Sequence, residues 1–309
     1  MKRRSTVKPA ALRPGDQIRI ISPCKSMTRE GIGPCAQAIA DAGYRVSFGE
    51  HTFSMTDGYA ASAEERAADF NAAVADPDVS MILFPGGEIS NEIIPLIDYG
   101  AIAAHPKIIS SYSDGTSVLN PVTYMTGLVT FYGGSTRLFE PVTEYNMQGF
   151  LRRLVQGSTE YTPASDWRVI RPGSGSGVLC GGYTVNFDSL IGLPQFGFPD
   201  RDYILILEDH ERFSSPKVES KWLNDLLQKG AFDRAKAVIF GHYSSDPEKL
   251  EKLFPVLRRI SDRIKIPFVY TDDFGHGANM ALFPLGTAAS LEAGVDSVKF
   301  SFLEPAVEI

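Results

Sequence analysis

The sequence predicts an α/β fold organised in two domains. Short apolar runs alternate with helix-like segments along the chain, which is the pattern of parallel β-α units. A chain of 309 residues is long enough for about two domains of roughly 150 residues each. Residues 156–177 are rich in Gly, Ser, Thr and Pro, as linkers are. We therefore predict an N-terminal domain over residues 1–155, a linker over 156–177 and a C-terminal domain over 178–309.

Composition and charge exclude several classes of protein. The hydrophobic fraction of 43% and the charged fraction of 22% are ordinary for a globular protein. The net charge is −7, so the chain lacks the basic face that binding to a nucleic-acid polymer requires. No apolar run approaches the roughly 18 residues of a membrane span. No apolar segment follows the basic start Lys2-Arg3-Arg4, so we expect neither a membrane partner nor a secretory signal.

The cysteines point to the compartment and argue against a metal site. Cys24, Cys35 and Cys180 are scattered and odd in number, which is typical of reduced, buried residues in a cytoplasmic protein. None of them belongs to a C-x-x-C pair, so we predict no metal site. The chain also lacks the G-x-G-x-x-G loop of nicotinamide-dependent enzymes, and we predict no cofactor.

In the N-terminal half, apolar runs predict strands and small-residue or capped segments predict helices. Strands are expected at residues 17–21, 44–48, 79–84, 108–109 and 128–132. Helices are expected at residues 33–42, 62–74 and 116–125, the second opened by the capping box Ser62-x-x-Glu65. Loops after parallel strands bind ligands, and glycine lets backbone N–H groups approach a ligand closely. Gly86 and Gly87 therefore predict a ligand-binding loop, with a simple tight turn as the alternative.

In the C-terminal half, the apolar runs at residues 203–207, 235–241 and 266–270 predict strands. A short helical segment is expected up to Leu193, and helices are expected at residues 217–230 and 250–260. The last strand is followed by a loop, residues 271–279, in which His276 stands between two glycines. These glycines predict a flexible, exposed histidine.

One turn in the N-terminal half has the form of a nucleophile elbow. Ser113 lies between an apolar strand and a helix, in the sequence Ser111-Tyr112-Ser113-Asp114-Gly115. Such a turn holds a hydroxyl clear of the sheet and directs the next backbone N–H groups toward it. The usual pattern is G-x-S-x-G, and Ser111 is as small as that pattern requires. Taken alone, the same residues are also those of a helix-capping serine.

Glu208 and His276 are candidates to act together with Ser113, because each of the three follows an apolar strand. A serine hydroxyl is too weakly acidic to attack alone, so a histidine must take its proton and a carboxylate must orient that histidine. A metal site in residues 208–212 is disfavoured, since successive strand residues point to opposite faces. We predict Ser113 as nucleophile, His276 as base and Glu208 as orienting carboxylate. The backbone N–H of Gly87 or Asp114 is predicted to hold the oxyanion.

A set of motifs in the right order carries a family resemblance. The motifs are Pro85-Gly-Gly-x-x-Ser-Asn-Glu, Ile97-Asp-Tyr, Pro106-Lys, Tyr-Ser-Asp-x-Thr116, Thr126-Gly-Leu-Val-Thr-Phe-Tyr-Gly133, Leu207-Glu-Asp209 and Phe274-Gly-His276. Over roughly residues 14–295 they resemble the LD-carboxypeptidase family of serine peptidases, and most closely its microcin C immunity branch. The resemblance implies a Ser-Glu-His peptidase with Ser113, Glu208 and His276 at the catalytic positions. It also implies an N-terminal parallel-sheet domain, a C-terminal domain with a β-barrel-like sheet and helices, and a homodimer.

The chain departs from that family at three positions around the elbow. The family usually has Gly where Ser111 stands, a larger residue at Gly115 and Pro at Gly134. Ser111 brings a Cβ to a tight turn, and Gly115 loosens the start of the helix. Neither change removes a catalytic group, so we expect activity.

The resemblance also suggests residues that contact the substrate. In the immunity branch an aromatic-bearing loop packs on a nucleotide base, and the segment around Trp167 looks shorter than that loop. Arg212 falls where the branch carries a lysine near an acidic substrate group, with a solvated charge as the alternative. Gly86, Arg212 and Trp167 are therefore the predicted substrate-binding residues.

Three functions follow from these observations. The first is hydrolysis of an amide in a peptidyl- or aminoacyl-nucleotide, as in microcin C immunity. The second is LD-carboxypeptidase action on murein tetrapeptides. The third, suggested by the altered elbow, is a catalytically silent protein that binds a small molecule. In each case we expect a small peptide or peptide-nucleotide as the ligand.

Overall fold

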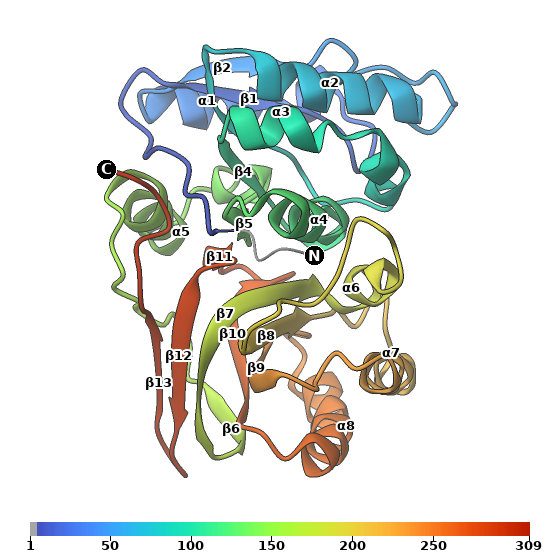
Figure 1. Cartoon of the computed structure of the whole chain (residues 1–309), viewed down its shortest axis with the longest axis vertical. Coiled ribbons are helices and arrows are strands. Elements are labelled where there is room, and N and C mark those ends of the chain that lie inside the picture. Colours follow the sequence, from blue (N-terminus) through green and yellow to red (C-terminus); the bar gives the residue numbers. More distant parts are fainter. Residues whose placement is uncertain (1–4) are drawn as a thin grey trace.

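The computed structural model describes residues 5–309, so Lys2, Arg3 and Arg4 lie outside the described residues. The described chain forms two halves, each built on its own sheet, stacked one above the other in Figure 1. The N-terminal strands are β1 Gln17–Ile20, β2 Arg45–Phe48, β3 Val79–Leu83, β4 Ile108–Ser111 and β5 Thr130–Tyr132. The N-terminal helices are α1 Arg29–Asp41, α2 Ala63–Ala75, α3 Tyr99–Ala104, α4 Thr116–Thr126 and α5 Glu144–Phe150, with shorter helical turns at Ser90–Leu96, Ser113–Gly115, Thr136–Leu138 and Leu151–Val155.

The N-terminal sheet has the order β11-β5-β4-β3-β1-β2. The strands β1 to β5 run parallel, and β11, Phe283–Leu285, is antiparallel to β5. Strands such as β3 are almost wholly buried because helices cover both faces of a parallel sheet. The N-terminal sheet is thus completed by a strand from the far end of the chain.

The C-terminal half has a curled, mixed sheet in the order β13-β12-β7-β8-β9-β10-β6. Its strands are β6 Arg168–Arg171, β7 Gly173–Tyr183, β8 Tyr203–Glu208, β9 Ala235–His242, β10 Phe268–Gly275, β12 Ala288–Ala293 and β13 Val298–Phe302. Its helices are α6 Thr184–Leu190, α7 Pro216–Gln228 and α8 Pro247–Ile264. β7 to β10 are parallel, so the carboxyl ends of β8, β9 and β10 meet at one edge.

The two halves share a hydrophobic core. Helix α4 contacts β4 and β5 of its own half and β7 and α6 of the other. One cluster of buried side chains includes Val118 and Val122 from α4 together with Ile204, Ile206 and Ile239 from the C-terminal sheet. Because α4 directly follows Ser113, this packing fixes the elbow relative to both sheets.

The α/β fold class is confirmed, and two local expectations are wrong. Residues 156–177 are not a linker throughout, because β6 and the first part of β7 lie within them. The loop at 271–279 is shorter than expected, because β10 continues to Gly275 and His276 directly follows it. The capping box at Ser62 and Glu65 is present as predicted.

Candidate active site

Ser113 has the strained backbone of an elbow. Its φ of 54° lies in the left-handed region, which is uncommon for a residue with a side chain. The strand β4 ends at Ser111, and a single helical turn at Ser113–Gly115 leads into α4. The Gly115 N–H donates to the Tyr112 carbonyl at 2.9 Å and closes the turn. The hydroxyl therefore stands at the junction of strand and helix, as the sequence predicts.

Two successive contacts at hydrogen-bonding distance connect Ser113, His276 and Glu208. The Oγ of Ser113 is 3.0 Å from Nε2 of His276. The Nδ1 of His276 is 2.8 Å from Oε2 of Glu208. Glu208 is completely buried at the end of β8, and His276 directly follows β10, which is separated from β8 by β9 in the same sheet. The fold thus brings together side chains that are 95 and 163 positions away from Ser113 in the sequence.

His276 is neither flexible nor exposed, contrary to the expectation from its two glycines. Its side chain is 12% exposed and packs against the rings of Tyr112 and Tyr183. A Cβ on Gly275, whose φ is 106°, would lie 3.0 Å from Oε2 of Glu208. A Cβ on Gly277 would lie 2.8 Å from Cγ of His242. These glycines permit close packing around the histidine and do not loosen it.

Burial and neighbouring charges shift the pKa of two histidines at the site. Burial lowers the pKa of His276, but the charge of Glu208 and its hydrogen bond outweigh burial, so the pKa is raised overall. The ring of His210 lies 5.5 Å from that of His276. Burial, followed by the positive charges of His276, His242 and Arg212, lowers the pKa of His210 to about 4. His210 therefore stays neutral at pH 7 beside His276.

The glycine loop after β3 lies against the elbow. A Cβ on Gly86 would lie 2.8 Å from Cβ of Ser113, and one on Gly87 would lie 2.1 Å from the Cys24 carbonyl oxygen. Only glycine fits this approach at either position. Among the hydrogen bonds of the described residues, none uses the N–H of Gly87 or Asp114. Both groups are therefore free to donate to a ligand.

The side chain of Asp114 stabilises the elbow and hydrogen bonds with none of the side chains of Ser113, His276 and Glu208. Its carboxylate accepts hydrogen bonds from the Ser90 N–H at 2.8 Å and from the Asn186 amide at 2.7 Å. The Ser90 hydroxyl donates to the Asp114 carbonyl at 2.7 Å. Burial raises the pKa of Asp114, although these donors oppose the increase. The backbone after Ser113 is thereby fixed to both halves of the chain.

Ser111 and Gly115 occupy each other's space. The hydroxyl of Ser111 donates to the Phe84 carbonyl at 3.0 Å. A Cβ on Gly115 would lie 2.2 Å from Oγ and 2.5 Å from Cβ of Ser111. The side chain at 111 thus fills the volume that a side chain at 115 would need. The two departures from the family pattern compensate for one another.

Neither of the other two predicted substrate-binding residues, Trp167 and Arg212, hydrogen bonds with the predicted triad, although the rings of His210 and Phe213, close to Arg212 in the chain, lie 5.5 and 6.0 Å from that of His276. Trp167 donates its indole N–H to Asp273 at 2.8 Å and stacks on Phe300, so it is anchored within the C-terminal half. Arg212 is exposed, and its backbone N–H donates to Nδ1 of His210 at 3.1 Å. Gly86 is the one predicted substrate-binding residue, within the described part of the chain, that contacts Ser113.

A buried carboxyl pair lies next to Glu208. Asp209 and Glu219 are 1% and 0% exposed, and each has one oxygen with no donor among the described residues. Because both carboxyl groups are buried and the charge of Asp209 acts on Glu219, we expect the pair to share one proton. Burial raises the pKa of Glu219 well above its usual range, and the proximity of Asp209 raises it further. Burial likewise raises the pKa of Asp209.

We expect Glu219→Gln to stabilise the protein at high pH. The raised folded-state pKa means that the Glu219 proton stabilises the fold below the unfolded-state pKa of about 4.3, and that this contribution is lost as the pH rises toward the folded-state pKa. Glutamine keeps a donor at every pH. Urea unfolding at about pH 5, 7 and 9 should show an advantage of the variant that grows by up to about 1.4 kcal/mol per pH unit. The exposed Glu251→Gln is the control, and parallel curves for Glu219→Gln would contradict the shared proton.

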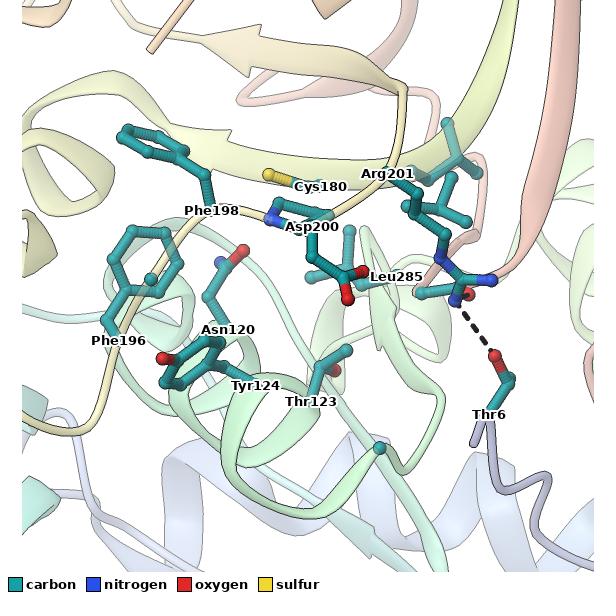
Figure 2. A pocket seen from close by; sticks show the side chains of 16 residues that line it. Thr6, Asn120, Thr123, Tyr124, Cys180, Phe196, Phe198, Asp200, Arg201 and Leu285 are labelled. Atoms are coloured by element: carbon teal, nitrogen blue, oxygen red, sulfur yellow. Dashed lines mark hydrogen bonds between the residues drawn. The ribbon is translucent and has the colours of Figure 1, made fainter. Parts of the chain in front are cut away.

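A separate cavity of about 260 Å³ lies toward the other end of α4. Figure 2 shows Asn120, Thr123 and Tyr124 on one side of it, and Phe196 and Phe198 on another. None of the predicted site residues lines this cavity. In residues 5–309 no group of three or more His, Cys, Asp or Glu side chains is arranged to hold a metal ion. Over the same range, no helix has the length and apolarity of a membrane span.

Sequence reasoning gave no role to Tyr132, although it lies at the centre of the site. Its hydroxyl donates to Oε1 of Glu208 at 2.5 Å and accepts from the Ser113 N–H at 3.1 Å. One feature of the sequence could have indicated a functional role: Tyr132 lies at the carboxyl end of a strand, before Gly133 and Gly134.

The chain is similar to known proteins over most of its length. The microcin C7 self-immunity protein MccF of Escherichia coli is 30% identical over 290 residues, covering 81% of this chain and 82% of MccF. The murein tetrapeptide carboxypeptidase of Pseudomonas aeruginosa is 23% identical over 292 residues, covering 89% of this chain and 93% of that one.

Solved structures are similar over nearly the whole chain. The MccF-like protein from Bacillus anthracis matches with a TM-score of 0.89 at 25% identity, covering 97% of this chain and all of that one. MccF in complex with aspartyl sulfamoyl adenosine matches with a TM-score of 0.85 at 25% identity, covering 98% of this chain and 100% of that one.

The family match covers most of the chain in two parts. Residues 18–133 match the LD-carboxypeptidase N-terminal domain, and residues 176–291 match the LD-carboxypeptidase C-terminal domain. These segments contain Ser113 in the first and Glu208 and His276 in the second. The chain therefore belongs to the LD-carboxypeptidase family and is a serine-type carboxypeptidase.

Proposed function

We propose that Ser113, His276 and Glu208 form a catalytic triad that hydrolyses the amide-type bond of an aminoacyl- or peptidyl-nucleotide through an acyl-enzyme. The proposal of a triad rests on two distances. Oγ of Ser113 lies 3.0 Å from Nε2 of His276, and Nδ1 of His276 lies 2.8 Å from Oε2 of Glu208. The substrate class is supported by the similarity to MccF, whose structure holds aspartyl sulfamoyl adenosine. A homodimer belongs to the proposal on the family resemblance alone.

The geometry supports a two-step reaction. Nδ1–H of His276 donates to Glu208, which leaves Nε2 as the base that takes the Ser113 proton. The serine oxygen attacks the scissile carbonyl, and the oxyanion is held by the free N–H groups of Gly87 and Asp114. His276 then protonates the leaving nitrogen as the C–N bond breaks. Water attacks the resulting ester with His276 as base, which releases the acid and restores Ser113.

A murein tetrapeptide is the second candidate substrate. It is favoured by the similarity over most of the chain to the murein tetrapeptide carboxypeptidase of Pseudomonas aeruginosa. The position of Trp167 is also compatible with it, since the indole is held by Asp273 and Phe300 within the C-terminal half. The same triad serves both substrates, because each reaction breaks a C–N bond at a carbonyl.

A direct comparison of the two substrates tests the proposal. The protein is incubated separately with aspartyl sulfamoyl adenosine and with a murein tetrapeptide, and products are identified by mass spectrometry. We expect release of aspartate from the first at a rate at least about tenfold above that of terminal amino-acid release from the second. The reverse ratio would replace the nucleotide substrate with murein and leave the triad intact. Binding of either compound with no turnover would make the protein catalytically silent.

A further inference from the structure

Tyr132 places a single hydroxyl between the two ends of the proposed triad. Its oxygen donates to Oε1 of Glu208 at 2.5 Å and accepts from the Ser113 backbone N–H at 3.1 Å. Ser113 follows β4 in the N-terminal sheet, and Glu208 ends β8 in the C-terminal sheet. We propose that Tyr132 is a positioning residue that fixes the nucleophile and the orienting carboxylate relative to each other across the two halves of the protein. This inference rests on the triad proposed above.

The residues around Tyr132 fix the position of its ring. The residue is completely buried, and Phe274 packs edge-on against its ring at 6.4 Å between centroids. A Cβ on Gly182, whose φ is 141°, would lie 2.9 Å from Cε2 of Tyr132 and 2.4 Å from Oγ1 of Thr116. Glycine at 182 therefore lets β7 approach the ring closely, and the hydroxyl has little freedom to leave its two partners.

The direction of each hydrogen bond is fixed. A backbone N–H can only donate, so the Tyr132 oxygen accepts from Ser113 and its own proton goes to Glu208. Burial raises the pKa of Tyr132 well above its usual range, and Glu208 raises it further, so the hydroxyl keeps its proton at neutral pH. Tyr132 is thus a permanent donor to the carboxylate.

Two consequences follow for the reaction. Because Oε1 of Glu208 is occupied by Tyr132, only Oε2 is directed at His276, which fixes the plane of the carboxylate and the ring. Because the Ser113 N–H is occupied, it does not serve the oxyanion. The proposed oxyanion donors are therefore the N–H groups of Gly87 and Asp114, whereas some serine hydrolases also use the N–H of the nucleophile itself.

Tyr132→Phe removes the hydroxyl and keeps the ring. We expect kcat to fall about 10- to 100-fold with KM changed less than about threefold, since the lost hydrogen bonds act on the reacting groups and not on substrate binding. Glu208 loses a donor and becomes a stronger base, so the pKa of His276 is expected to rise by at least about half a unit. Tyr203→Phe, which removes a buried hydroxyl bonded to the Ala231 carbonyl at 2.9 Å, is the control and should leave both quantities unchanged.

The pKa of His276 is measured by NMR titration of protein labelled with ¹⁵N-histidine, so the test does not depend on turnover. A second variant carries 3-fluorotyrosine at position 132, which keeps the ring and makes the hydroxyl a stronger donor. It should lower the pKa of His276 and keep activity. Opposite pKa shifts in the two variants support the inference, and an unchanged pKa in Tyr132→Phe overturns it. If the wild-type protein cleaves neither substrate, the proposed function fails, but the titration still decides the role of Tyr132.

Discussion

Replacing Ser113 with alanine is expected to lower kcat/KM by about 10⁴-fold or more. The reason is that the Ser113 oxygen, 3.0 Å from Nε2 of His276, is the proposed attacking atom, and alanine has no group that can attack in its place. Affinity for the substrate should change less than about tenfold, because the hydroxyl reacts with the substrate and does not hold it. Steady-state kinetics and equilibrium binding of the uncleaved substrate measure the two effects.

Ser110→Ala is the matched control for this prediction. Ser110 is completely buried and lies on β4, the strand that leads to Ser113, but its hydroxyl donates to the Gly134 carbonyl at 2.5 Å and not to His276. Its loss should cost about 1–3 kcal/mol of stability and leave turnover within several-fold of the wild type. Full turnover in Ser113→Ala would remove Ser113 from the reaction.

The second large effect concerns Ser111 and Gly115 at the elbow. Gly115→Ala places a Cβ 2.2 Å from Oγ of Ser111, so we expect it to destabilise the protein by about 1–3 kcal/mol. Because the elbow must shift to relieve the clash, kcat/KM should fall by about 100-fold. Combining Gly115→Ala with Ser111→Gly removes the clash and should restore most of both losses.

A double-mutant cycle of urea unfolding and kinetics checks this pair. Ser111→Gly alone gives up the hydrogen bond to Phe84 and should cost about 1 kcal/mol. The interaction free energy between the two substitutions should therefore exceed about 1 kcal/mol in favour of the double variant. If the effects of the two single substitutions add up to the effect of the double variant, the two positions are independent. The inference that Ser111 and Gly115 compensate for one another would then be wrong.

The sequence was least reliable where glycine serves packing. Residues 173–177 look like a flexible linker, yet they form the start of β7. A Cβ on Gly175 would lie 2.1 Å from the Lys236 carbonyl oxygen, and one on Gly177 would lie 2.5 Å from that of Asp202. The contacts that require these glycines come from residues more than 20 positions away, so local composition cannot distinguish them from a linker. The same holds for Gly275 and Gly277 beside His276.

The sequence by itself determined the α/β class, the alternation of strands and helices, and the three strand ends that carry Ser113, Glu208 and His276. It did so because apolar periodicity is local and because ligand-binding residues gather at the carboxyl ends of parallel strands. Only the tertiary structure decided which atoms meet. The 3.0 Å distance from Ser113 to His276 and the hydrogen bond from Tyr132 to Glu208 join the two sheets. The 2.8 Å distance from His276 to Glu208 and the hydrogen bond from Ser113 to Tyr132 join strands that are distant in sequence within one sheet. Such contacts depend on how the two halves pack around α4, and no local pattern in the chain encodes that packing.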